Sequence, residues 1–323
     1  MTATVSLERT SVRSSSADDA STGKVGRRRD AERVPRRDAP PLSPRLQLIR
    51  AVLVLVLVLT GSLFLQLLLV SGLQQSAAQG RAFDLFRADL AKGTAPLGPT
   101  DRDGAELTPG TPVAFLEIPR IELEQVVGEG TSASVLFDGP GHRRDTMLPG
   151  QVGTTVVFGR RAAFGGPFSD IVSLREGDII TATTGQGEFE YTVIGVRFEG
   201  DPAPPPVAAG GSRLTLVTAG GRAFMPEGAI RVDAEMTTGA VIGPARLYSA
   251  GSLPLEDRLM AGDARTLWVM AFWLQALIVL SLAAVWSWHR WGHVQTWVVF
   301  MPALVLVGLS ASGEFARLLP NLM

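Results

Sequence analysis

The chain has 323 residues, and its 30 lysines and arginines nearly balance its 31 aspartates and glutamates, for a formal charge of −1. This balance argues against a nucleic-acid-binding protein, which usually carries a strong basic excess. The absence of cysteine excludes disulfides, iron–sulfur clusters, thiolate metal sites and a cysteine nucleophile. The length allows about two domains.

The chain has three histidines, His142, His289 and His293. The last two have the i,i+4 spacing of a helical metal site, but no carboxylate or thiol accompanies them. We therefore expect an interfacial turn at this pair, and the sequence predicts no metal and no other cofactor.

Residues 1–50 are rich in arginine, serine and proline and nearly lack aromatic side chains. Such a segment cannot bury enough apolar surface to offset its ordering entropy, so it is predicted to be a disordered basic tail. Its runs Arg27-Arg28-Arg29 and Arg36-Arg37 are either a solvated determinant of topology or a contact for anionic lipid headgroups.

Three uncharged apolar stretches follow the pattern of membrane spans, at residues 51–73, 267–288 and 294–312. A cleaved signal peptide is the competing interpretation of the first stretch, but it conflicts with the 50 residues that precede the stretch and with its length. The other two stretches flank a short turn, and all six tryptophans lie in this region. A buried hairpin of a soluble domain is the alternative that we set aside.

The basic leader predicts that the first helix begins in the cytoplasm, because Lys/Arg-rich flanks stay inside. Residues 74–266 then lie outside, the tip of the helical hairpin lies inside, and the protein is a multi-pass plasma-membrane protein. Arg290 is the one unambiguous cation at that tip, so the orientation depends on the first helix.

Residues 74–110 are helix-compatible at first and then turn-rich, which predicts a stalk and a linker. Short alternating segments bounded by Gly, Pro and Asp follow to residue 236, and residues 237–266 form a second linker. This pattern predicts an all-β barrel or sandwich. The expected strands are residues 113–119, 122–127, 154–158, 179–183, 189–197, 214–218 and 229–236.

The order of motifs between residues 111 and 236 resembles that of a sortase, in particular of the actinobacterial sortases. The residues that carry the resemblance are segments 116–123, 139–142, 148–153, 156–161, 164–168, 174–178, 189–193 and 214–221. The resemblance implies a closed eight-stranded barrel outside the membrane of a Gram-positive, actinobacterial cell. Sortases cut a C-terminal sorting signal with a cysteine thiolate, assisted by a histidine and an arginine, and pass the acyl group to an envelope amine.

The chain departs from this family at the reacting positions. Ala219 stands where the resemblance places the cysteine, and Arg160 stands where it places the histidine. Alanine offers no nucleophile, and an arginine does not shuttle protons near neutral pH. The family's arginine falls near residues 227–229, neither end of which is basic, so Arg231 or Arg222 is a candidate for that place.

Other residues near the expected peptide groove of the sortase-like barrel have structural as well as functional interpretations. A hydroxyl of Thr218 or Ser212 would need a partnered base to react, and His142 is expected to be a hydrogen-bonded loop histidine. Arg160 either pairs with an acid, such as Asp178 or Glu227, or binds an anionic group in the groove. The proline-rich stretch 201–207 is a partner contact or a stiff connector.

These observations predict a catalytically inactive, membrane-anchored sortase-like protein that binds a peptide or scaffolds a secreted or membrane protein of the envelope. One alternative is an accessory subunit of a membrane complex, in which Gln66 and Gln275 make polar contacts between apolar helices. The other is an active transpeptidase or hydrolase that works without cysteine.

Overall fold

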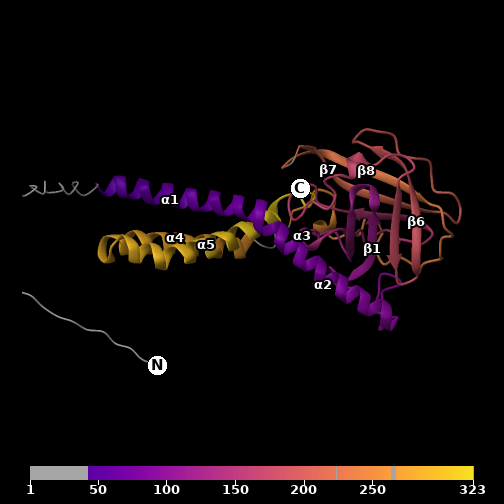
Figure 1. Ribbon diagram of the computed structural model, residues 1–323, viewed down its shortest axis with the longest axis horizontal. Coiled ribbons are helices and arrows are strands. Elements are labelled where there is room, and N and C mark those ends of the chain that lie inside the picture. The colour runs from indigo at the N-terminus through magenta and orange to yellow at the C-terminus, as the bar shows by residue number, and fades with distance from the viewer. Residues whose placement is uncertain (1–42, 223, 250, 263–266, 323) are drawn as a thin grey trace, which may run out of the picture. The chain divides into compact units, whose positions relative to one another are not determined.

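The structure is a computed structural model that describes residues 43–222, 224–249, 251–262 and 267–322 (Figure 1). The disorder expected for the basic tail lies, apart from its last eight residues, outside the described part of the chain. Those last residues belong to helix α1 (Pro44–Leu65), apart from Ser43, which precedes it.

A closed mixed barrel follows the first helices, which confirms the eight-stranded fold (Figure 1). The strands pair in the order β1-β2-β3-β4-β7-β8-β6-β5, and only the pairs β2/β3 and β4/β7 are parallel. Their bounds are β1 Pro112–Ile118, β2 Leu123–Glu129, β3 Gly141–His142, β4 Gly153–Phe158, β5 Ile179–Thr184, β6 Gly187–Arg197, β7 Ser212–Arg222 and β8 Met225–Met236.

Short helical segments connect the strands. Helix α3 (Ala133–Asp138) lies between β2 and β3, one turn of 3₁₀-helix lies between β1 and β2, another lies between β4 and β5, and a third follows β8. These turns are η2 Pro119–Ile121, η3 Ile171–Ser173 and η4 Leu255–Asp257.

Alternating apolar side chains fill the barrel interior. Leu116, Leu214, Leu216 and Val232 belong to one cluster of fully buried side chains contributed by strands that are distant in sequence. The hydroxyl of Tyr191 accepts a hydrogen bond from the Gly150 N–H at 2.7 Å, so the one strongly polar atom of this buried ring is satisfied.

The N-terminal helix runs without interruption from the apolar segment to the barrel. Helix α1 continues through one π-helical turn, η1 (Gln66–Val70), into α2 (Ser71–Lys92), which ends where Gly93 adopts a left-handed conformation with φ 65°. Helix α2 covers most of the segment expected to be a stalk, and it packs against β1, β2 and α3.

Glutamines hold α2 on the barrel. The Gln79 amide nitrogen donates to the Val126 carbonyl at 3.1 Å, and its oxygen accepts the Val126 N–H at 2.7 Å. A side-chain amide therefore takes the place of a neighbouring strand beside β2. The rings of Phe83 and Phe115 add an aromatic contact with centroids 5.2 Å apart.

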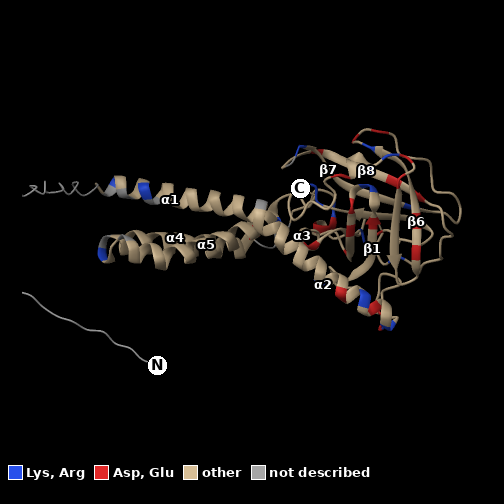
Figure 2. Ribbon diagram, viewed as in Figure 1, with Lys and Arg blue, Asp and Glu red and all other residues tan. Residues whose placement is uncertain are grey.

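Among the described residues, three helices are long and apolar enough to cross a membrane, within Leu48–Leu65, Leu267–Trp288 and Val294–Leu318. They belong to α1, α4 (Leu267–Trp291) and α5 (His293–Leu318), which run side by side (Figure 1). Figure 2 shows that most charged residues lie on the barrel and on α2, and that α1, α4 and α5 are uncharged over most of their length.

Candidate functional site

The parallel pairing of β4 with β7 creates the candidate site. Phe158 is the last residue of β4 and lies opposite Val217. Because a parallel register advances equally on both strands, Arg160 and Ala219, each two residues further on, lie at the same end of the barrel. The Gly159 N–H donates to the Val217 carbonyl at 3.0 Å and extends the ladder to this point.

Arg160 is buried in an aromatic setting. Its side chain is 1% exposed, and its guanidinium carbon lies 4.5 Å from the centroid of the Phe137 ring and 5.1 Å from that of Phe164. Burial lowers the pKa of Arg160 to about 9. The residue therefore keeps its charge at neutral pH, and it holds no lone pair there with which to act as a general base.

Ala219 presents only a methyl group. It lies opposite Ala229 of β8 and is 3% exposed. The neighbouring Thr218 hydroxyl donates to the Gly159 carbonyl at 2.8 Å, so this hydrogen bond joins β7 to the residue that follows β4. Arg161 contributes a contact that sequence reasoning missed, because its guanidinium donates to the Ala219 carbonyl at 2.9 Å.

The two candidate arginines of the β7/β8 hairpin lie at different places. Arg231 is half-buried and lies opposite Val217, so it shares a face of the hairpin with Ala219 and Ala229. Arg222 is exposed and is the last residue of β7, further toward the hairpin turn. The register therefore favours Arg231 over Arg222 as a neighbour of the site.

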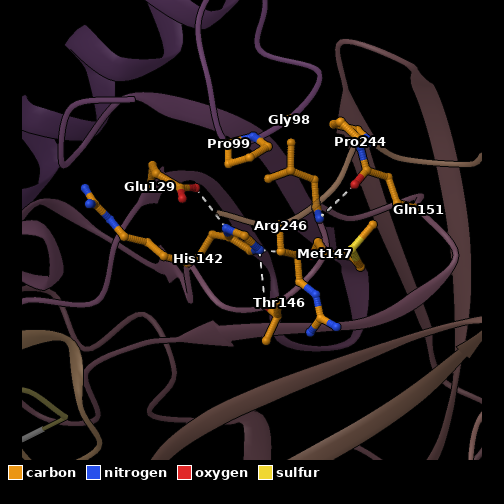
Figure 3. A pocket seen from close by; sticks show the side chains of 11 residues that line it. Gly98, Pro99, Glu129, His142, Thr146, Met147, Gln151, Pro244 and Arg246 are labelled. Atoms are coloured by element: carbon orange, nitrogen blue, oxygen red, sulfur yellow. Dashed lines mark hydrogen bonds and ion pairs between the residues drawn. The ribbon is translucent and has the colours of Figure 1, made fainter. Parts of the chain in front are cut away.

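His142 belongs to a separate small pocket (Figure 3). Its Nδ1 lies 2.8 Å from the Glu129 carboxylate, and its Nε2 lies 2.9 Å from the Met147 carbonyl and 3.2 Å from the Thr146 hydroxyl. Both ring nitrogens are thus engaged in a buried network around the short strand β3. This environment is that of a structural histidine.

A leucine from the far end of the chain closes the site. Leu322 is fully buried in a cluster with Leu136, Phe158, Val217, Ala219 and Ala229. Sequence reasoning missed it, because no local pattern says where the residues after an apolar helix will pack. The available signal was an apolar residue directly after Pro320 and Asn321, where a charged flank is more usual.

The described residues offer no candidate set of metal ligands. Within the described ranges, no group of three or more His, Cys, Asp or Glu residues is placed to hold a metal ion. The site combines a buried guanidinium, a methyl group, a backbone-bound hydroxyl and apolar side chains. In this described set the Thr218 hydroxyl donates to a backbone carbonyl and is not paired with a side-chain base.

A family model matches most of the barrel. Residues 116–228 match the Sortase domain family. The chain is 34% identical to Sortase D from Bacillus subtilis (strain 168) over 85 residues, which are 26% of this chain and 41% of that protein. The match thus covers about two fifths of the relative's length.

The comparison with solved structures finds partial likenesses to sortases. A Sortase D5 transpeptidase from Clostridium perfringens is 21% identical and has a TM-score of 0.42, with coverage of 50% of this chain and 99% of that chain. A structure of Clostridium perfringens sortase C with the C-terminal cell wall sorting motif is 22% identical, with a TM-score of 0.38 and coverage of 50% and 89%. A sortase E variant from Streptomyces avermitilis is 29% identical, with a TM-score of 0.35 and coverage of 47% and 100%.

Proposed function

We propose that this protein is a membrane-anchored, catalytically inactive sortase-like protein that binds a peptide or protein of the cell envelope. The observation that carries the proposal is the pair Arg160 and Ala219 at the ends of β4 and β7. A cationic arginine packed against two phenyl rings does not exchange protons, and a methyl group does not attack a carbonyl.

The sortase-like barrel supports a binding role. A relative, Clostridium perfringens sortase C, has been solved with a C-terminal cell wall sorting motif. We propose that the groove beside Ala219 takes an extended peptide of this kind without cutting it. The three apolar helices support anchoring in the plasma membrane. The basic leader supports a barrel on the extracytoplasmic side, and the resemblance to actinobacterial sortases supports an actinobacterial envelope.

The proposal is tested by turnover of a fluorogenic peptide that carries the sorting motif seen with Clostridium perfringens sortase C. We expect no cleavage by the full-length protein in mild detergent. Turnover that is lost in Thr218→Val would overturn the inactive assignment, because Thr218 carries the hydroxyl next to Ala219. Met225→Ala, at the exposed start of β8, is the control for effects of mutation elsewhere on the β7/β8 hairpin.

The binding role is tested by co-purification of the tagged full-length protein, with mass spectrometry of the partners. Recovery of secreted proteins that end in sorting-type segments supports the groove as the binding site. If those proteins are recovered equally by a variant with Ala219→Trp, which fills the groove, then the groove is not where they bind.

A second candidate function is that of a subunit in a membrane complex. Gln275 is exposed in the interior of the α4 span, whereas Gln66 is buried and donates to Gln74 at 3.1 Å. An amide facing hydrocarbon favours a polar contact with another helix. We expect Gln275→Leu to lose a co-purifying membrane protein that Val279→Ala, one turn away, retains. Equal recovery by both variants contradicts this role for Gln275.

A further inference from the structure

The chain leaves α5 in the direction of the barrel. The helix ends at Leu318, and Leu319 is extended with φ −71° and ψ 153°. Pro320 explains the end of the helix, because a proline disfavours helical backbone in the residue before it. Gly262 lies so close to this exit that a Cβ on it would be 2.5 Å from the Leu318 carbonyl oxygen.

Asn321 anchors the segment that follows. It is fully buried, and its backbone N–H donates to the Ala261 carbonyl at 2.9 Å. Its side-chain amide donates to the carbonyls of Thr131 at 2.9 Å and Arg258 at 3.0 Å. Three hydrogen bonds thus tie one residue to the loop before α3 and to the segment around Arg258.

The wall that holds Asn321 is itself fixed to the barrel. The Thr131 N–H donates to the Asp257 carboxylate at 2.9 Å, and the Thr131 hydroxyl donates to the Asp257 carbonyl at 2.7 Å. Met260, in the same segment, has a left-handed backbone with φ 58° and packs against the cluster that contains Leu322. A non-glycine residue in this conformation is costly, and the surrounding contacts must hold it in place.

Leu322 then fills the space at the strand ends. Its carbonyl accepts the Arg161 N–H at 3.1 Å, and its side chain is buried in the apolar cluster that includes Ala219. Arg161 therefore hydrogen-bonds to both Leu322 and Ala219: its backbone N–H donates to the Leu322 carbonyl, and its guanidinium donates to the Ala219 carbonyl. Backbone hydrogen bonds together with a socket for a side chain are the usual means by which a groove binds an extended peptide.

We propose that the groove beside Ala219 is a peptide-binding site whose resident ligand is the Leu319–Leu322 segment of the same chain. The amide clamp selects asparagine, and the apolar socket selects an aliphatic residue directly after it. A second peptide enters only when this segment leaves. The proposal goes beyond the proposed function, since it holds whether or not a partner peptide exists.

The absence of cysteine makes the test clean, because Ala219→Cys introduces the one thiol of the chain. We expect slow labelling of this thiol by a maleimide in the full-length protein in mild detergent. Labelling should be at least tenfold faster when Leu322→Lys is added, because the socket is apolar and an ammonium group cannot stay in it. Leu322→Ile is the matched control and should label slowly. As a further control, Thr237→Cys introduces an exposed thiol after β8. The maleimide should label this thiol at the same rate with and without Leu322→Lys.

A second measurement uses a peptide with the sequence of residues 317–323. We expect it to bind a variant that stops after Leu318, and to bind the full-length protein at least tenfold more weakly. The same peptide with alanine in place of asparagine should bind the shortened variant weakly. Equal labelling of the thiol in the Leu322 variants, or equal peptide binding by the two chain lengths, would overturn the proposal. Neither readout depends on turnover, so either result is distinct from a failure of the inactive assignment.

Discussion

Arg160 shows how a buried charge can be accommodated by rings. Phe137 and Phe164 are stacked with centroids 3.9 Å apart, and both lie within reach of the guanidinium. A planar, weakly hydrated guanidinium suits this environment better than a compact ammonium group does. Phe164 adopts a left-handed backbone with φ 53°, which indicates that the local fold is held for this contact.

We expect Arg160→Lys to lower the free energy of unfolding by about 2 kcal/mol, the scale of a desolvated cation–π contact. The measurement is the midpoint of thermal unfolding of the full-length protein in mild detergent. Arg222→Lys, at the exposed end of β7, should change the free energy of unfolding by less than about 0.5 kcal/mol. Equal effects of the two substitutions would show that the aromatic setting does not distinguish arginine from lysine.

The resemblance predicted that Arg160 and Ala219 belong to one site, because it aligned the ends of two strands. The parallel register of β4 and β7 places both residues at the same end of the barrel. The contacts of those residues were not predictable. Nothing local to Arg160 indicates two phenyl rings, which come from α3 and from the loop after β4. Leu322 reaches the site only through the folding of the whole chain, so no pattern around Ala219 could reveal it.

At the scale of elements, Gln79 contributes three hydrogen bonds to the attachment of α2 to the barrel. β2 pairs with β3 over only two residues, so much of one β2 edge is free of strand partners. Gln79 bonds the Val126 N–H and carbonyl on that edge, and also donates to the Asp138 carbonyl at 2.8 Å. Covering a strand edge in this way removes a site for unwanted pairing.

We expect Gln79→Ala to raise the hydrogen-exchange rate of the Val126 amide about tenfold or more, because a buried donor then lacks its acceptor. The measurement is amide exchange by mass spectrometry on the full-length protein. Ser76→Ala, on the exposed face of α2, should leave this rate unchanged. An unchanged rate in Gln79→Ala would mean that α2 is held by its apolar contacts alone.

One close contact joins two of the three long helices, α1 and α5. A Cβ on Gly308 of α5 would lie 2.4 Å from the Ser62 Oγ of α1 and 3.1 Å from its Cβ. Small residues let helices approach closely where lipid gives no hydrophobic drive for association. Gly61, next to Ser62, has nothing within 4 Å of a Cβ placed on it.

We expect Gly308→Leu to destabilise the bundle by about 1–3 kcal/mol through overpacking. Gly61→Leu adds the same side chain where there is room, and it should leave the thermal midpoint of the full-length protein unchanged or raise it. If both variants lowered the thermal midpoint equally, the destabilisation would come from the leucine side chain itself and not from the α1–α5 contact.

The strands were largely predictable at this scale, and the exceptions have physical reasons. Alternation revealed seven segments, and the structure adds β3, whose two residues are too short to show a period. Strands β7 and β8 are longer than alternation indicates. Gly220 and Gly221 carry no side chains to alternate, yet Gly221 with φ 81° lets the β7/β8 ladder continue past Ala219.

For the whole molecule, the orientation in the membrane remains a prediction from the basic leader. We expect a cysteine at Thr237 to react with a membrane-impermeant maleimide on intact cells, and a cysteine at Arg290 to react only after permeabilisation. Both positions are exposed, so access to the reagent decides the result. The opposite pattern would invert the topology and place the barrel in the cytoplasm.

The Leu319–Leu322 segment runs directly from the end of α5 into the groove. A peptide that competes for the groove must therefore reach a place close to the end of α5. Leu322 lies four positions after Leu318, and an extended chain spans about 14 Å at most over four residue steps. If α5 crosses the membrane, as proposed above, a groove so near its end lies close to the headgroups. A partner that displaces the Leu319–Leu322 segment must therefore present its own peptide near the bilayer, as a protein still attached to the membrane would.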